Sequence, residues 1–295
     1  MNLELRQLRY FVALAEELHF GRAATRLHMT QPPLSQTIAA FEEALGAPLF
    51  LRSRRQVELT PAGHALLPEA RRLLAAAAGL PELVRRAASG EAGRLALSFV
   101  TPADYSVLPP LLRDYSAAFP AVQLVLREAT TDVQVDDLLH ERIDAGVVIG
   151  PLPDKAQAAL AWRRLLEEPL VLCAPAGLLQ GSGPVELAAL PPLPLVIFPR
   201  KSAPSLYDAI LSCFHDAGIV PVIGQEAIQM QTIVSLVSAG MGLALVPQSV
   251  SNLMRPGVEY RGLGGRSPLV ELGLCWRRDN ASPVLRGFLD LLKKE

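Results

Sequence analysis

GRAATRLHMTQPPLSQTIAAFEEALG, residues 21–46, is the stretch that decides the fold of the N-terminal part of this chain. Its first part carries small alanine side chains, which let another helix cross closely. Thr30 is a good N-cap, and Pro32-Pro33 fits the first turn of a helix, where the missing N–H groups would have no intrahelical partner. The stretch therefore predicts a short helix, a turn at residues 28–30 and a second helix that runs to Gly46.

The second of these helices has one apolar stripe, and so does the segment before the stretch. Apolar side chains recur at steps of three and four residues, which is the spacing of a single buried helix face. They are Leu34, Ile38, Phe41 and Leu45 in the second helix, and Leu5, Leu8, Phe11, Val12 and Ala15 in the preceding segment. Gln31, Ser35 and Gln36 are left on an outer face that is short, uncharged and able to form hydrogen bonds. Such a face after a helix and a turn is typical of a helix-turn-helix, in which Gln can pair with adenine.

A basic hairpin follows this pattern. Residues 49–51 and 57–59 read as two short strands of a wing, and a run of arginines lies between them. Taken alone, these arginines would be interpreted as an ordinary solvated hairpin, but beside a helix-turn-helix we expect them to contact phosphates or a minor groove. The predicted DNA contacts are Thr30, Gln31, Pro32, Pro33, Ser35, Gln36, Arg52, Arg54 and Arg55.

A long helix is predicted from Thr60-Pro61 toward Ala88, with Thr60 as cap and proline at the first position. Within it, apolar residues repeat at heptad spacing, which indicates a coiled-coil seam with a second chain. They are Leu66, Leu73, Leu80 and Ala87, with Ala70, Ala77 and Val84 between them. Pro68 and Pro81 predict kinks, because each removes a backbone hydrogen bond.

Composition excludes several classes of protein. The chain has 295 residues, of which 50% are hydrophobic and 19% are charged, with a formal charge of -1, so it is neither disordered nor uniformly basic. Residues 1–90 carry a net charge of +3 and the remainder carries -4, which suits a DNA-binding N-terminal part. The three cysteines are widely spaced and predict neither disulfides nor a metal site. With no signal peptide pattern and no apolar run of about 20 residues, a soluble cytoplasmic protein is expected.

The remaining two hundred residues predict an α/β domain. Ser89–Gly93 breaks the long helix, and apolar strands then alternate with helical patterns, which indicates a parallel sheet. The predicted strands are 94–101, 122–128 and 144–149, with helices at 108–119 and 131–141. A second set comprises 169–174, 195–198, 204–217, 229–239 and 243–246, followed by a last strand at 269–277 and a helix at 284–293. Two such sets predict two lobes.

Three segments of these lobes are candidates for a ligand site. They are residues 100–102, 129–131 and 198–205, and each joins the end of a predicted strand to the start of a helix. In open α/β sheets, ligands bind beyond the carboxyl ends of the strands, where helix N-termini offer free N–H groups to anions. We therefore expect a small organic acid to bind where the three segments meet.

The N-terminal stretch resembles the LysR-type transcriptional regulators. The matching residues are Leu8–Phe11, Phe20–Leu27, Thr30–Ser35, Phe41-Glu42, Leu45-Gly46, Leu49-Phe50 and Leu59–Gly63. The resemblance implies a winged helix-turn-helix at residues 1–59, a linker helix that pairs two chains at 60–88, and an effector-binding domain at 89–295. It also implies double-stranded promoter DNA as a partner, a homotetramer built as a dimer of dimers, and a contact with RNA polymerase.

The same resemblance implies a two-lobed, periplasmic-binding-protein-like architecture for the C-terminal domain. Lobe I would comprise about residues 91–163 and 269–295, and lobe II about 164–268. The chain would cross between the lobes near Ala161–Leu165 and Gly265–Leu269.

The chain is similar in particular to family members that respond to aromatic or dicarboxylic acids. The positions that this likeness places against the effector are Thr101, Pro102, Thr131, Ser202, Pro204, Ser205 and Leu206, and we add Arg200 and Gln231 as candidates. Pro102 and Leu206 depart from the hydroxyl and aromatic residues that those members often carry. Thr131 is otherwise interpreted as an N-cap, Arg200 as part of a solvated loop, and Gln231 as a residue that faces water.

An enzyme is not expected. The five histidines include no metal-binding pair, no nucleophile or phosphate-binding motif occurs, and Gly240-Met241-Gly242 follows a predicted helix rather than opening one. No cofactor and no metal are therefore predicted. The alternative is a small-molecule-binding or catalytic α/β protein whose N-terminal helices serve only oligomerisation, but it leaves Thr30–Ser35 and the basic wing unexplained.

Overall fold

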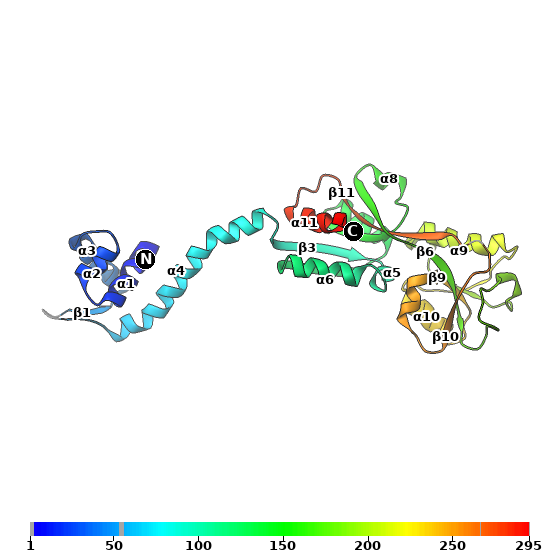
Figure 1. Ribbon diagram of the computed structural model, residues 1–295, viewed down its shortest axis with the longest axis horizontal. Coiled ribbons are helices and arrows are strands. Elements are labelled where there is room, and N and C mark those ends of the chain that lie inside the picture. The colour runs from blue at the N-terminus through cyan, green and yellow to red at the C-terminus, as the bar shows by residue number, and fades with distance from the viewer. Residues whose placement is uncertain (1–2, 53–55, 266, 295) are drawn as a thin grey trace. The chain divides into compact units, whose positions relative to one another are not determined.

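The computed structural model describes residues 3–52, 56–265 and 267–294, and the chain divides into two compact units, Met1–Arg85 and Arg86–Glu295 (Figure 1). Each unit has its own hydrophobic core. Within the described ranges, no helix is long and apolar enough to cross a membrane.

The first unit contains the predicted helix-turn-helix and wing. Its elements are α1 (Leu5–Glu17), α2 (Phe20–Arg26), α3 (Gln31–Leu45), β1 (Phe50–Arg52) and β2 (Val57–Leu59). The three helices, blue in Figure 1, enclose a core in which the ring of Phe11 packs edge-on against Phe41, with 6.2 Å between centroids. The strands pair antiparallel, with Phe50 opposite Leu59. The apolar periodicity therefore predicted these helices correctly.

Thr60 joins the wing to the long helix α4 (Pro61–Ala88), as predicted. Its hydroxyl oxygen accepts a hydrogen bond from the backbone N–H of Gly63 at 3.0 Å, which caps the first turn. Gly63 has no room for a side chain, because a Cβ atom there would lie 2.3 Å from the carbonyl oxygen of Leu49. The start of α4 is thus packed directly on the wing.

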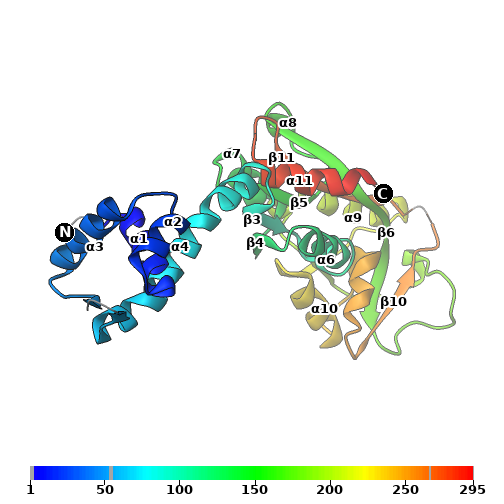
Figure 2. The same ribbon diagram turned by 60° about the vertical axis from the view of Figure 1, so that its left-hand side comes forward.

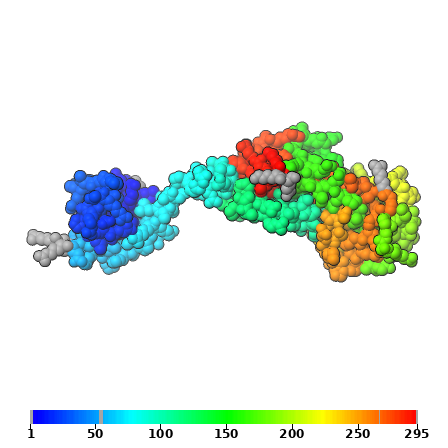
Figure 3. All heavy atoms as spheres, in the orientation of Figure 1, coloured from blue at the N-terminus to red at the C-terminus, as the bar shows by residue number. Residues whose placement is uncertain are grey.

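The apolar stripe of α4 divides into a buried part and an exposed part. Ala70 is fully buried, and Leu66 packs against the same core of the first unit. The seam predicted to pair two chains is therefore wrong at these two positions, since their neighbours lie within the chain. Further along the helix, whose atoms are cyan in Figure 3, large apolar side chains are exposed. They are Leu73, Leu80, Leu83 and Val84, with exposed fractions of 46, 55, 57 and 66%.

The second unit is built on a seven-stranded sheet with the order β10-β6-β11-β5-β3-β4, in which β9 also pairs with β6. The strands are β3 (Ala92–Phe99), β4 (Ala121–Glu128), β5 (Ala145–Ile149), β6 (Leu160–Pro175), β9 (Ala244–Pro247), β10 (Val258–Gly262) and β11 (Leu269–Arg277). β3 runs parallel to β4 and β5, as predicted, whereas β11 is antiparallel to β5 and β6. β7 (Leu195–Ile197) and β8 (Ile223–Glu226) form a separate parallel pair.

Helices connect these strands in the predicted alternation. They are α5 (Thr101–Asp104), α6 (Leu108–Ala118), α7 (Thr131–Leu139), α8 (Asp154–Gln157), α9 (Pro204–Asp216), α10 (Met230–Ser238) and α11 (Pro283–Leu291). Short 3-10 turns occur at η1 (Leu187–Ala189), η2 (Arg200–Ser202), η3 (Gln248–Leu253) and η4 (Leu292–Lys294).

β6 changes partners along its length and so joins two lobes. Residues 160–169 pair with β11, whereas residues 170–175 pair with β9 and β10. We call the part with β3, β4, β5 and β11 lobe I, and the part with β7 to β10 lobe II. The first predicted crossing, at 161–165, is wrong, because those residues are still paired with β11. The second, at 265–269, includes residue 266, which lies outside the described residues.

The sheet of lobe I is covered on both faces. Successive residues of a strand point to opposite sides, so Val147 and Val148 of β5 belong to different cores. Val147 shares its core with Tyr115 of α6 and Phe288 of α11, whose rings meet edge-on at 5.0 Å. Both helices are labelled in Figure 2. Val148 lies in the core under α7. This packing holds the carboxyl ends of β3, β4 and β5 at one rigid edge.

Candidate functional site

The N-terminal turn of α3 presents a polar face without charge. Its exposed residues are Thr30, Gln31, Pro32, Pro33 and Gln36, and Ser35 is half-buried. Thr30 occupies the N-cap position, but its hydroxyl makes no capping hydrogen bond in the described structure. The predicted side-chain cap is therefore wrong, and the Thr30 side chain is available on the exposed face. Leu34 and Ile38 point inward and are fully buried.

The described part of the wing is tied to α3 by the Glu42 carboxylate. One Glu42 oxygen accepts hydrogen bonds from the backbone N–H groups of Leu49 and Phe50, at 2.8 and 3.0 Å. The other oxygen pairs with the guanidinium of Arg52, which also lies 5.3 Å from the ring centroid of Phe20. The charge of Arg52 is thus already paired within the unit. Arg54 and Arg55 lie outside the described residues.

A cavity of about 190 Å³ lies between the two lobes of the second unit. It is lined from lobe I by Val100, Thr101, Pro102, Glu128, Ala129, Thr130, Thr131 and Ile149, and from lobe II by Phe198, Ser202, Ala203, Leu206, Ile228, Gln229 and Met230. Glu128 and Ile149 are the last residues of β4 and β5, and α7 and α10 begin at the cavity. The cavity therefore occupies the carboxyl edge of the sheet, where open α/β folds bind ligands.

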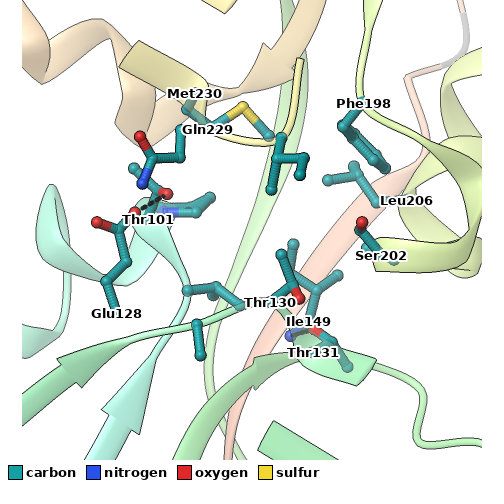
Figure 4. Close-up of a pocket in the computed structure, with 15 residues that line it drawn as sticks. Thr101, Glu128, Thr130, Thr131, Ile149, Phe198, Ser202, Leu206, Gln229 and Met230 are labelled. Carbon is teal, nitrogen blue, oxygen red and sulfur yellow. Dashed lines mark hydrogen bonds between the residues drawn. The ribbon is translucent and has the colours of Figure 1, made fainter. Parts of the chain in front are cut away.

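Two buried hydroxyls form one polar corner of this cavity (Figure 4). Thr131 and Ser202 are each 5% exposed. The Thr131 oxygen accepts a hydrogen bond from the backbone N–H of Ile149 at 3.2 Å, which leaves its proton free to donate. Ser202 makes no side-chain hydrogen bond with any described residue, and its hydroxyl points into the cavity. The Ser202 oxygen is not among the side-chain atoms that are sealed off without a partner, so it is reached from the cavity, and this corner can offer two O–H donors to a ligand acceptor.

The opposite corner carries a carboxylate. The hydroxyl of Thr101 donates a hydrogen bond to Glu128 Oε1 at 2.5 Å. Figure 4 shows the Gln229 amide pointing toward this pair. Thr101 is 8% exposed, whereas Glu128 is exposed at the open side of the cavity. The corner thus combines a fixed acceptor with solvent access.

A buried amide holds the loop between these corners. Gln134 of α7 is fully buried, and its side-chain nitrogen donates to the carbonyl oxygens of Ala129 and Val147, at 2.7 and 3.2 Å. The amide lies against Gly146, where a Cβ atom would come within 2.5 Å of its oxygen. Gln134 therefore fixes the start of α7 relative to β5, and with it the position of Thr131.

A second buried network connects the cavity wall to the crossing strand. Glu168 of β6 is 5% exposed, and its oxygens accept hydrogen bonds from the N–H and hydroxyl of Ser249, at 2.6 and 2.8 Å. The Ser249 hydroxyl also lies 3.4 Å from the carbonyl oxygen of Pro102, which lines the cavity. Burial raises the pKa of Glu168, although the bonds from Ser249 oppose this effect. Ser249, in η3, thus links lobe I to β6.

Both units of the chain match models of known protein families. Residues 5–64 match the model of the bacterial regulatory helix-turn-helix protein of the lysR family, and residues 88–295 match the model of the LysR substrate binding domain. The chain belongs to the LysR family of transcriptional regulators. Like its relatives, this LysR-type regulator binds DNA and controls transcription.

Individual relatives resemble the regulator over its whole length. The HTH-type transcriptional regulator IlvR of Caulobacter vibrioides is 52% identical over 293 residues, which cover 99% of this chain and 98% of that protein. AlsR of Bacillus subtilis is 39% identical over 290 residues, covering 98% and 95%. The crystal structure of full-length CbnR complexed with its target DNA has a TM-score of 0.76 and 31% identity, and covers 99% of both chains. These relatives are regulators, so the alternative of a catalytic α/β protein is wrong.

The cavity of the LysR-type regulator contains five of the nine predicted effector residues. Thr101, Pro102, Thr131, Ser202 and Leu206 line it. Arg200, Pro204, Ser205 and Gln231 do not. Arg200 is paired with Asp208 through two bonds of 2.8 Å, and Ser205 donates to the carbonyl oxygen of Gly150 at 2.9 Å. Pro204 is exposed at the first turn of α9, and Gln231 lies beyond the first residue of α10.

Sequence reasoning missed Glu128, Ile149 and the start of α10. The first two end strands that were predicted, so the rule that ligands bind beyond carboxyl ends could have found them. Gln229 and Met230 begin a helix whose start was predicted within one residue, yet only Gln231 was singled out. Val100 and Phe198 lie in two of the three predicted segments, although neither was named as a contact. Ile228 carries no signal in the sequence, because any apolar side chain could occupy its place.

The described part of the regulator offers no group of three or more His, Cys, Asp or Glu residues that could hold a metal ion. All three cysteines are buried and free. Burial raises the pKa of Cys173 and Cys275 to about 12 and that of Cys213 to about 11, so each remains a protonated thiol at neutral pH.

Proposed function

We propose that this regulator senses a small organic acid in the cavity between its lobes and, in response, changes how it holds promoter DNA. The observation that supports the proposal is the corner formed by Thr131 and Ser202, where the Ser202 hydroxyl makes no hydrogen bond with a described residue and faces the cavity. Leu206 and Pro102 would supply apolar walls to the rest of the ligand. Such a site is incomplete until an acceptor group enters it.

An acid is favoured over a neutral ligand at this corner. The helices α7 and α10 both begin at the cavity, and the first N–H groups of a helix have no intrahelical partner. A helix N-terminus carries about half a positive charge, so it attracts a carboxylate before any side chain does. Arg200 does not take part, because Asp208 already neutralises it.

For the DNA side, we propose that α3 enters the major groove. Gln31, Ser35 and Gln36 would face base edges, while arginines of the wing contact phosphates or the minor groove. The exposure and lack of charge on this face support the assignment. Sequence preference would then come from α3, and most of the salt-dependent affinity from the wing.

We further propose that the exposed face of α4, formed by Leu73, Leu80, Leu83 and Val84, pairs two chains, and that two such pairs form a tetramer. A monomer would leave this apolar face in water. The two α3 helices of such a pair would bind half-sites that lie about one helical turn of DNA apart, or a multiple of it. The assembly would act in the cytoplasm, with RNA polymerase as a further partner.

Ligand binding can change this assembly only if the ligand prefers one arrangement of the lobes. The lining supports such a preference, because it comes from both lobes and a change in their angle would alter the contacts of a bound ligand. Ser249 and its bond partners lie beside the cavity and would be the first to respond.

The test is DNA binding with and without an acid that stabilises the protein in a thermal-shift screen. Thr131→Val and Ser202→Ala should keep basal DNA binding and lose the response, because they remove the hydroxyls of the corner. Ser212→Ala is the matched control, since its hydroxyl bonds within α9, outside the cavity. A full response at the parent's acid concentration in both corner variants would place the sensing site elsewhere.

Assembly is tested by Leu73→Asp, which should dissociate the oligomer in light scattering, because a charge would be buried in the paired face. Ala75→Asp, on an exposed position of the same helix, should not. If Leu73→Asp retains the parent mass, α4 does not pair the chains.

A further inference from the structure

The one charged side chain among the described residues that line the cavity is acidic, which does not suit a simple anion site. Among the described residues that line it, Glu128 alone carries a charge, and no Lys or Arg joins it. Thr101 donates to one Glu128 oxygen, and the carboxylate makes no other hydrogen bond or ion pair with the described chain. One carboxylate oxygen at the cavity therefore lacks a donor.

The donors and this acceptor lie at opposite ends of the cavity. In Figure 4, Ser202 and Thr131 stand on one side and the Glu128–Thr101 pair on the other. The walls between them are apolar, with Ile149 and Leu206 among them. A ligand that satisfies both ends needs an acceptor group at one end, a donor group at the other, and little else that is polar.

We propose that the effector is a small amino acid zwitterion, with its carboxylate against Ser202, Thr131 and the start of α7, and its ammonium against Glu128. This inference rests on the proposed role of the cavity as the effector site. The volume of about 190 Å³ suits such a ligand, since pockets for drug-sized molecules begin at about 300 Å³. The class is that of ω-amino acids with a short apolar chain, because the two charged groups of an α-amino acid sit on one carbon and cannot reach both ends of the cavity.

Two other classes of acid fit less well. A dicarboxylate would place its second charge beside Glu128, with no cation in the described lining to offset the repulsion. A plain aliphatic acid would shield the unpaired Glu128 oxygen from water without offering a donor. The hydrogen bonds that this oxygen makes with water would then be lost without replacement. An ammonium group avoids both the charge repulsion and the missing hydrogen bond, because it donates to the Glu128 carboxylate and neutralises its charge.

The test compares four five-carbon acids by isothermal titration calorimetry on the full-length protein at pH 7. They are 2-aminopentanoate, 5-aminopentanoate, pentanoate and pentanedioate, which separate the α-amino form, the ω-amino form, the plain acid and the dicarboxylate. We expect 5-aminopentanoate to bind about three- to tenfold more tightly than pentanoate, 2-aminopentanoate to gain little over pentanoate, and pentanedioate to bind least.

Glu128→Gln isolates the charge. The variant keeps the shape and one acceptor oxygen, so it should bind pentanoate at least as well as the parent while losing the three- to tenfold preference for the amino acid. Asp104→Asn is the matched control, because Asp104 is exposed on α5 beside Thr101 but does not line the cavity. It should keep the preference.

The outcomes separate this inference from the proposed function. If the parent binds any of the other three acids as tightly as 5-aminopentanoate, or if Glu128→Gln keeps the preference, the zwitterion that spans the cavity is wrong while an acid-sensing cavity stands. If the parent binds none of the four probes, the zwitterion is equally wrong. The acid-sensing function itself fails only in the DNA-binding test with Thr131→Val and Ser202→Ala.

Discussion

The first turn of α3 and the cavity between the lobes use the same kinds of side chain, hydroxyls and amides, in opposite settings. Gln31 and Gln36 are exposed, whereas Thr131 and Ser202 are each 5% exposed. An exposed polar group stays hydrated until its partner arrives, while a buried one needs a partner inside the protein. Substitutions on α3 should therefore alter the choice of partner alone, and substitutions in the cavity should alter stability as well.

The largest effect is expected for Thr131→Val. The change removes the acceptor for the buried N–H of Ile149 and should cost about 1–3 kcal/mol in the free energy of unfolding, besides the effector response. Urea denaturation of the second unit's transition measures it. Thr131→Ser keeps the oxygen and should recover most of the loss. Equal stability of the valine variant and the parent would mean that the folded protein does not depend on the Thr131 hydroxyl.

Gln31→Ala should show the reverse pattern. Discrimination at one base pair should fall by about 1–3 kcal/mol, while the midpoint of unfolding stays close to that of the parent. Competition binding against a set of single-base operator variants, together with a thermal melt, provides both numbers. A uniform loss across all operators would mean that Gln31 contacts the DNA backbone instead.

Glu168→Gln tests what a buried charge does to pH dependence. Burial raises the pKa of Glu168 above its ordinary value of 4.5, so the stability it contributes is full below that pH and is lost as pH rises through the raised value. The glutamine variant has nothing to ionise. The difference in melting temperature, variant minus parent, should therefore increase as pH rises from about 4.5 to neutrality.

Glu167→Gln is the control for this effect, because Glu167 is exposed beside Arg164 on the same strand. It should show no such gain. Melting curves of parent and Glu168→Gln that run parallel across the whole pH range would mean that Glu168 does not change its charge at a cost.

The smallest effect is expected for Arg52→Ala. The paired guanidinium contributes about 1 kcal/mol or less to stability, since exposed ion pairs and cation–π contacts are weak. Its DNA affinity should fall alike on all sequences, with a smaller change in salt slope than the decrease of about 1 expected for Arg54→Ala. A larger slope change for Arg52→Ala would show that DNA displaces Glu42.

The sequence predicted the elements well where one physical signal dominates. Leu34, Ile38 and Phe41 are buried because the helical period leaves them no other face, and Thr60 caps α4 through its own hydroxyl. Periodicity could not say which molecule covers an apolar face. Leu66 and Leu73 carry the same signal, yet the first packs within the chain and the second is exposed.

The cavity was predicted in part, for a related reason. Thr131 and Ser202 mark strand-to-helix junctions, which local sequence reveals. Arg200 also lies at a strand-to-helix junction, but its charge is paired with that of Asp208 in α9. Local sequence does not reveal such a pairing, because it depends on how the chain folds back. The crossing was placed too early because β6 is one long strand, and nothing in residues 160–175 shows where its partners change.

The separation of the α3 face from its own core bears on how such regulators diverge. Gln31 and Gln36 are exposed while Leu34 and Ile38 fill the core, so mutations on the exposed face can change operator preference at nearly constant stability. A substitution of a buried hydroxyl in the cavity, such as that of Thr131, changes the stability of the protein as well as its ligand binding. Within a lineage, target sites should therefore drift faster than the chemical class of the inducer.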